Sequence, residues 1–134
     1  MKTNLELATT VVNQLKKSGK TLAVAESLTG GGLGAAITEV AGSSEVFLGG
    51  ITTYSDLSKT KLLEVSKKLI TKHTAVSEEV AKEMAANARH GTRAFGNLCA
   101  GVVGTTRAKP RHAVCRWIEH QTVLCALLGV DGLQ

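Results

Sequence analysis

Three side chains on two segments of the chain have the chemical types that acyl transfer requires. Ser27 follows one apolar run, and Tyr54 and Lys59 follow another. A serine hydroxyl becomes a nucleophile when a base accepts its proton, and a lysine serves as that base when burial lowers its pKa from about 10.4. A tyrosine hydroxyl between them would relay the proton or hold the lysine neutral. The sequence therefore predicts Ser27 as nucleophile, Lys59 as base and Tyr54 as relay.

A glycine-rich turn beside Ser27 suits a negatively charged ligand or intermediate. Residues 26–32 read Glu-Ser-Leu-Thr-Gly-Gly-Gly and open a predicted helix. Unpaired backbone amides at a helix start and the helix dipole both favour negative charge. We therefore expect the amides of Gly30, Gly31 and Gly32 to hold a phosphate or a carbonyl oxygen. Glu26 is either a catalytic carboxylate or a buried partner of a backbone amide or a lysine.

Each residue of this set also has an ordinary structural explanation. A lone serine such as Ser27 is more often a helix cap or turn residue, and Tyr54 suits the end of an amphipathic strand. A lone lysine such as Lys59 is more often a solvated surface residue. Tyr54 and Lys59 converge only if a turn falls between them, which residues 55–56 would supply. Spacing alone leaves these explanations open.

The segments that must position these residues alternate between strand and helix patterns. The predicted strands are 21–25, 46–53, 98–103 and 113–118. The predicted helices are 5–18, 32–39, 59–65, 67–73, 78–89 and 121–128, with Gly19 ending the first and Ser66 and Ser77 as N-caps. This alternation predicts an α/β fold in one domain over residues 1–134, a single layered domain with a central sheet flanked by helices.

Two features of the predicted strands bear on the site. The first two strands place Ser27 and Tyr54 at their carboxyl ends, where open α/β sheets usually bind ligands. If the strands are neighbours, those ends are adjacent in space. The pair Gly49-Gly50 inside the second strand suggests a bulge or a close approach of two backbones.

Composition and charge limit the classes of function. No apolar run approaches the roughly 18 residues that cross a bilayer, and the N-terminus lacks an apolar signal core. We therefore expect a cytoplasmic protein with no membrane partner. The net charge of +5 is spread along the chain without interleaved aromatic residues, so nucleic acid is a minor alternative and a small anionic ligand fits equally well.

No motif predicts a metal or a cofactor. Cys99, Cys115 and Cys125 and the four histidines show no metal-ligand spacing. Gly30-x-Gly32-x-x-Ala35 meets the loose dinucleotide fingerprint, but the acidic residue expected about 20 positions later is missing. A P-loop motif is absent as well. We expect the site to work without either group.

The same residues lie in three segments that resemble a known family. These are AESLTGG at 25–31, AGSSEVFLGGITTYSDLSK at 41–59 and HTAVSEEVAKEMA at 73–85. They resemble the CinA C-terminal-domain family, the nicotinamide-nucleotide amidases related to competence/damage-inducible protein A, over about residues 4 to 104. The resemblance implies an α/β amidohydrolase that converts nicotinamide mononucleotide to nicotinic acid mononucleotide and ammonia.

The resemblance also implies roles for individual positions. The family's serine, tyrosine and lysine fall on Ser27, Tyr54 and Lys59. Contacts with the small-molecule nucleotide substrate would fall on Thr29, Gly30, Gly31 and Gly104.

Four departures from the family pattern affect this expectation. Leu28 replaces the usual cysteine, Asp56 an asparagine and Thr74 a glycine. The loop after Gly104 lacks the family's proline and glycines, and residues 110–134 are divergent or shortened. An alternative is therefore a catalytically impaired nucleotide-binding or regulatory module of the same fold. An exposed sheet edge at this end would favour a homo-oligomer.

Overall fold

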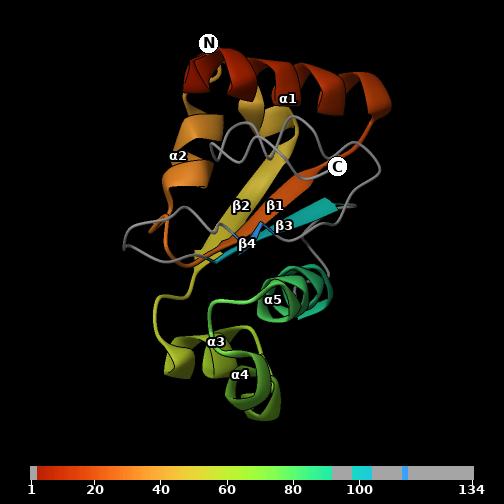
Figure 1. Cartoon of the computed structure of the whole chain (residues 1–134). Coiled ribbons are helices and arrows are strands. Elements are labelled where there is room, and N and C mark those ends of the chain that lie inside the picture. Colours follow the sequence, from red (N-terminus) through yellow and green to blue (C-terminus); the bar gives the residue numbers. More distant parts are fainter. Residues whose placement is uncertain (1–2, 92–97, 104–112, 115–134) are drawn as a thin grey trace.

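A four-stranded sheet forms the centre of the molecule (Figure 1). The computed structural model describes residues 3–91, 98–103 and 113–114, with side chains described for residues 3–88. The strands are β1 (Leu22–Glu26), β2 (Phe47–Thr52), β3 (Leu98–Val103) and β4 (Ala113–Val114), in the order β2-β1-β3-β4. β1 is parallel to β2 and β3, and β4 is antiparallel to β3. The predicted α/β fold with helices flanking a central sheet is confirmed.

One face of the sheet is covered by α1 (Asn4–Ser18) and α2 (Gly32–Thr38) (Figure 1). Leu22 and Val24 of β1 point into this layer, because successive strand residues face opposite sides. The buried α1 residues recur at helical spacing and are Ala8, Val11, Val12 and Leu15. Leu5 lies in the first turn of α1 and is 48% exposed. Gly19 ends α1 in the left-handed conformation, as predicted.

The other face is covered by α5 (Glu78–Gly91), beside α3 (Asp56–Leu62) and α4 (Lys67–His73) (Figure 1). Ala23 and Ala25 of β1 point into this layer, and their small side chains let α5 approach the sheet closely. The buried face of α5 has helical spacing and includes Val80, Met84 and Ala88. β1 is therefore buried on both faces, as expected of a central parallel strand.

β2 follows a short 3-10 helix, η1 (Ser43–Glu45), and carries the predicted glycine irregularity. The register between β1 and β2 shifts so that Leu48 is an extra residue on β2. A Cβ atom at Gly50 would lie 2.5 Å from Val24 Cγ2 and 3.2 Å from the Val24 carbonyl oxygen. Both expectations for the glycine pair are confirmed, since β2 has an irregular register and its backbone lies close to β1.

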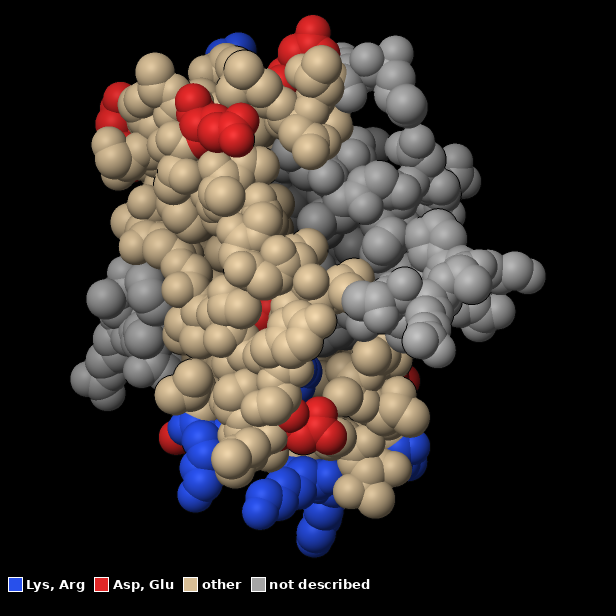
Figure 2. Space-filling view, turned by 90° about the vertical axis from the view of Figure 1, so that its left-hand side faces the viewer, with Lys and Arg blue, Asp and Glu red and all other residues tan. Residues whose placement is uncertain are grey.

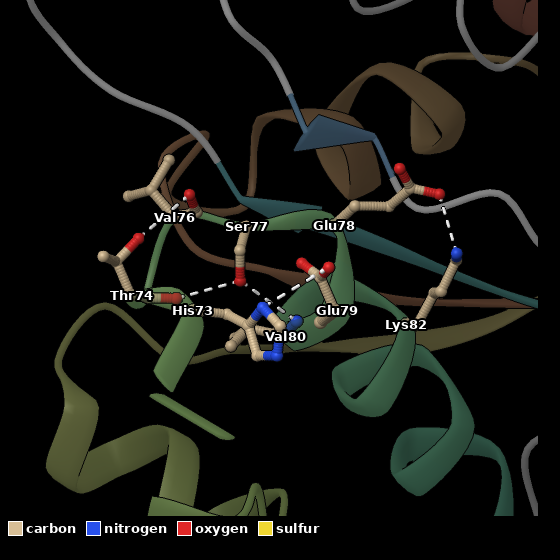
Figure 3. Close-up of polar contacts among 8 residues, drawn as sticks. All are labelled: His73, Thr74, Val76, Ser77, Glu78, Glu79, Val80 and Lys82. Atoms are coloured by element: carbon tan, nitrogen blue, oxygen red, sulfur yellow. Dashed lines mark hydrogen bonds and ion pairs between the residues drawn. The ribbon is translucent and has the colours of Figure 1, made fainter. Parts of the chain in front are cut away.

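The turn between α4 and α5 contains the least favourable backbone geometry among the described residues (Figure 3). Thr74 has a φ of 70°, a left-handed value that is rare for a β-branched residue. Its hydroxyl donates to the Val76 carbonyl at 3.3 Å. Its carbonyl accepts from the Ser77 hydroxyl at 2.9 Å, and His73 Nδ1 lies 3.4 Å from Glu79 Oε1. Local polar contacts therefore hold this turn.

Other element boundaries differ from the sequence prediction by a few residues. β1 includes Glu26, and the helix that contains Lys59 begins at Asp56 and ends at Leu62 instead of Val65. The predicted helix 121–128 and the strand residues after Val114 lie outside the described residues. Within the described part of the chain, no helix has the length and apolar character that a bilayer crossing requires.

Candidate active site

Ser27 and Lys59 meet at the carboxyl edge of the sheet. The Thr53 amide donates to the Glu26 carbonyl at 2.7 Å, which continues the pairing of β1 with β2 to the point where both strands end. Lys59 Nζ donates to Ser27 Oγ at 2.9 Å and to the Thr53 carbonyl at 2.9 Å. The two residues are 32 positions apart in the sequence. The fold thus assembles the pair that the sequence analysis selected.

The helix α3 holds the Lys59 side chain inward. Ser55 caps the helix, and the Ser55 and Ser58 side chains form reciprocal hydrogen bonds with each other's backbone amides. At the other end of α3, the amides of Leu63 and Val65 both donate to the Lys59 carbonyl. Lys59 is the buried residue of this helix, with 2% of its surface exposed. Its position is therefore fixed by contacts of both its backbone and its amine.

Burial lowers the pKa of Lys59 below its usual value of 10.5, because desolvation disfavours the charged amine. The nearby charge of Asp56, three positions earlier on α3, opposes this effect and raises the pKa. Burial is the larger of the two causes. A neutral amine has a lone pair that accepts the Ser27 proton, while its N–H group still donates to the Thr53 carbonyl. The arrangement is that of a serine nucleophile with a lysine base.

Tyr54 occupies a different position from the other two residues. Its side chain is 67% exposed, whereas Ser27 is 9% exposed. The Ser27 hydroxyl and the Lys59 amine contact each other directly at 2.9 Å, which leaves no space for a third group between them. The structure therefore brings two of the three predicted residues together and does not place Tyr54 between them.

Two of the three amides that the sequence suggested as free donors are used within the glycine turn itself. The Gly30 amide donates to the Ser27 carbonyl at 3.0 Å, and the Gly32 amide donates to the Thr29 carbonyl at 2.9 Å. These bonds are local turn contacts, which the residue types alone did not reveal. Gly31 has a φ of 101° and is the N-cap of α2, a conformation that favours glycine. The expected cradle of three amides is therefore corrected: two of the three are used within the turn.

Glu26 is a buried acceptor for backbone amides, one of the two roles the sequence left open. Its side chain is 1% exposed. Its Oε2 atom accepts from the Leu33 amide at 2.9 Å and from the Thr29 hydroxyl at 2.5 Å. Its Oε1 atom accepts from the Gly34 amide at 2.9 Å. The first turn of α2 thus binds a carboxylate of its own chain.

Thr53 is the site residue that sequence reasoning missed. Its carbonyl accepts from Lys59, its amide donates to Glu26, and its side chain is fully buried. Its hydroxyl has no hydrogen-bond partner among the described residues. The sequence contained no signal for these roles of Thr53 except that Thr53 precedes Tyr54, because the roles depend on backbone atoms. Gly104, the fourth predicted substrate contact, lies outside the described residues.

Exposed lysines gather on α3, which carries Lys59, and on the following helix α4. Figure 2 shows basic side chains at the end of the molecule formed by α3 and α4. The exposed lysines of these helices are Lys61, Lys67, Lys68 and Lys72. Their charge favours anionic molecules near this end. In the part of the chain that the structure describes, no three His, Cys, Asp or Glu side chains gather into a metal-binding group.

Comparison with known proteins gives a consistent family. The model of the CinA C-terminal domain matches residues 4–118. The chain is 46% identical to a CinA-like protein of Parasynechococcus marenigrum over 112 residues, which are 81% of this chain and 27% of that protein. It is 52% identical to a CinA-like protein of Citrifermentans bemidjiense over 90 residues, 67% of this chain and 21% of that protein. The chain thus spans about a quarter of the length of the curated relatives it matches.

Solved structures show the same fold. The crystal structure of the competence damage-inducible protein A from Klebsiella pneumoniae aligns with a TM-score of 0.75 and 30% identity, covering 81% of this chain and 66% of that one. A CinA superfamily protein from Escherichia coli aligns with a TM-score of 0.76 and 26% identity, covering 96% of this chain and 84% of that one. The family model covers well over half of the sequence, and both sequence relatives and the Escherichia coli structure carry the CinA name. The chain therefore belongs to the CinA C-terminal domain family.

Proposed function

We propose that this protein is an amidohydrolase that deamidates nicotinamide mononucleotide to nicotinic acid mononucleotide and ammonia. The observation that supports it most strongly is the 2.9 Å hydrogen bond between the buried Lys59 amine and the Ser27 hydroxyl. Hydrolysis of a carboxamide needs a nucleophile, a base that activates it, and an acid that protonates the leaving nitrogen. One serine and one neutral lysine supply all three functions.

The first half of the reaction forms an acyl-enzyme. Ser27 Oγ attacks the carboxamide carbon and its proton passes to Lys59 Nζ. The tetrahedral intermediate then collapses, the C–N bond breaks, and the proton on Lys59 moves to the departing nitrogen, which leaves as ammonia. The contact of Lys59 with the Thr53 carbonyl holds the amine in place through both transfers.

The second half regenerates the enzyme. A water molecule loses a proton to Lys59 and attacks the acyl carbon. The ester bond to Ser27 Oγ breaks, and Lys59 returns the proton to that oxygen. The product is formed as the carboxylic acid and loses its remaining proton to solvent, so the net reaction consumes one water and releases one ammonia. Tyr54, which the sequence suggested as a proton relay, is exposed and takes no step in this scheme.

The substrate contacts belong to the same proposal. In the glycine turn, the exposed Gly30 and the neighbouring Gly31 are expected to contact the substrate, and Thr29 and Gly104 are the other expected contacts. The lysines of α3 and α4 provide positive charge at the end of the molecule that also holds Lys59, which suits the phosphate of a nucleotide. No metal or cofactor enters the scheme.

A second candidate is a nucleotide-binding module that has lost turnover. The altered sequence after Gly104 favours it, because the usual proline and glycines of that loop are replaced by Thr-Thr-Arg-Ala-Lys. Such a module would bind the nucleotide without releasing ammonia. The two candidates therefore differ in one measurable product.

Ammonia release from nicotinamide mononucleotide tests the proposal. We expect turnover by the wild type and a loss on the order of 10³-fold or more in Ser27→Ala, because the nucleophile is removed. Ser44→Ala, at an exposed serine of η1, is the matched control and keeps full activity. Undiminished turnover in Ser27→Ala would overturn the assignment of the nucleophile. Binding by calorimetry without ammonia release would favour the second candidate.

A further inference from the structure

We propose that Glu26 is a positioning residue that fixes the turn containing Ser27 to the first turn of α2. Because its carboxylate already occupies the backbone amides there, the start of α2 does not bind an anionic group of the substrate. This inference rests on the proposed role of Ser27 as nucleophile. Glu26 immediately precedes Ser27, and its carboxylate accepts hydrogen bonds from Thr29, Leu33 and Gly34. It thus joins the residues on both sides of the glycine turn.

The contacts of Glu26 close the turn at both of its ends. The backbone carbonyl of Glu26 is held by the Thr53 amide at 2.7 Å, and Thr53 also contacts the base, Lys59. The side chain of Glu26 is held by the first turn of α2. Ser27 therefore follows directly after a residue whose backbone is fixed to the end of β2 and whose side chain is fixed to α2. This fixation sets the direction from which the Ser27 hydroxyl meets Lys59.

The chemistry of the acceptor explains why a carboxylate is needed here. Three donors converge on two oxygen atoms, and a carboxylate has only acceptor sites. A glutamine would bring an NH₂ group to face the Leu33 or Gly34 amide, so one of the three bonds would be replaced by two opposed donors. The carboxylate also lies where the helix dipole favours negative charge. An additional anion at these amides would meet both an occupied donor set and a like charge.

The kinetics of the Glu26→Gln variant distinguish two roles of Glu26. In the first it positions Ser27, and in the second it only covers an anion-binding site at the start of α2. If Glu26 positions Ser27, kcat for nicotinamide mononucleotide falls by about 10²-fold while KM stays within about twofold, because small misplacement of a reacting group acts on the chemical step. If α2 is instead an anion site, Glu26→Gln lowers KM and tightens the binding of inorganic phosphate. The second result would overturn the inference.

A second pair of variants keeps the test valid if Glu26→Gln does not fold. Thr29→Val removes the hydroxyl bond to Glu26 and preserves the shape of the side chain, whereas Thr29→Ser preserves the hydroxyl. Because Thr29 is also an expected substrate contact, the two variants are compared with each other: we expect kcat to fall further in the valine variant than in the serine variant, which keeps the donor to Glu26. Equal rates in both would overturn the inference. Glu39→Gln, at an exposed glutamate at the other end of α2, is the charge-matched control and keeps wild-type kinetics.

Labelling of Ser27 by a fluorophosphonate, followed by mass spectrometry, separates this inference from the proposed function. The labelling rate reports the placement of the nucleophile without the nucleotide substrate. If the wild type is labelled at Ser27 but releases no ammonia, the proposed function fails, and slower labelling of Glu26→Gln still supports the inference. If the wild type releases ammonia and Glu26→Gln does so equally fast, the inference fails and the function stands. A wild type that does neither refutes both.

Discussion

At the scale of single residues, the Lys59 amine makes the stability of the fold depend on pH, and the proposed activity as well. Burial lowers its pKa in the folded protein, whereas in the unfolded chain the amine has its ordinary value. The unfolded chain therefore binds the proton more tightly, and the contribution of Lys59 to the free energy of unfolding rises with pH between the folded pKa and 10.5. The neutral form that favours stability is also the form that accepts the Ser27 proton in the proposed mechanism. The two pH dependences share one titration.

Asp56→Asn should move the acid limb of the pH–activity profile to lower pH. The Asp56 charge raises the pKa of Lys59, so removing it lets the amine lose its proton at lower pH. Because Asp56 is exposed, the shift should shrink at high ionic strength. The measurement is kcat/KM against pH at two salt concentrations. Glu64→Gln, which removes an exposed glutamate shortly after the same helix, should leave the profile in place, and an equal shift there would contradict the assignment to Asp56.

The sequence predicted the residue types of the site better than their contacts. Ser27 and Lys59 were predicted from a hydroxyl and an amine that follow two strands and from the family resemblance of their segments, and the parallel pairing of β1 with β2 brings these segments together. Two of the three amides expected to be free in the glycine turn, those of Gly30 and Gly32, form local turn bonds instead. These bonds depend on backbone geometry, as does the return of the Glu26 side chain to the amides of Leu33 and Gly34.

At the scale of elements, most helix starts were readable because capping is local chemistry. Ser66 and Ser77 accept hydrogen bonds from the amides of Leu69 and Val80, as their positions predicted. The end of α3 was not readable. Glu64 adopts a φ of 52° there, and both Leu63 and Val65 are buried against the core of the α5 side. Packing across the fold, rather than propensity along the helix, ends α3.

Thr74→Gly should stabilise the protein by about 1 kcal/mol. A left-handed backbone costs a non-glycine residue about 1–3 kcal/mol, and the greater freedom of glycine in the unfolded chain offsets part of that gain. The weak hydrogen bond from the Thr74 hydroxyl to Val76 is lost in the change. Urea unfolding provides the measurement. Thr74→Ala loses the same hydroxyl but keeps a Cβ atom at a φ of 70°, so it should not reproduce the gain.

At the scale of the whole molecule, the site joins two helical layers across one strand. Ser27 and Glu26 leave β1 toward α2, whereas Lys59 comes from α3 on the opposite side of the sheet. The layer that holds Lys59 is tied to α5 by two contacts between distant residues. Asn87 Nδ2 donates to the Leu63 carbonyl at 2.8 Å, and the Ser66 amide donates to Glu83 Oε2 at 3.2 Å. The position of the base therefore depends on α5 as well as on its own helix.

Asn87→Ala should lower the free energy of unfolding by about 1 kcal/mol, because the Leu63 carbonyl loses its side-chain donor in a partly buried place. Asn13→Ala makes the same chemical change at an exposed position of α1. It should raise the free energy of unfolding by roughly a few tenths of a kcal/mol, because alanine has the higher helix propensity. Thermal unfolding of the two variants provides the comparison. Equal effects in both would show that the contact between α5 and the α3–α4 connection contributes nothing.

The extra residue Leu48 in β2 has a consequence for molecules that meet in solution. β2 is the outermost strand on its side of the described sheet. The backbone N–H and C=O groups of β2 that point away from β1 follow the shifted register. An incoming strand from another copy would find an uneven spacing of donors and acceptors around Gly49, which has a φ of 140°. Regular ladders require even spacing, so this irregularity discourages intermolecular strand addition and the fibrous aggregation that follows from it.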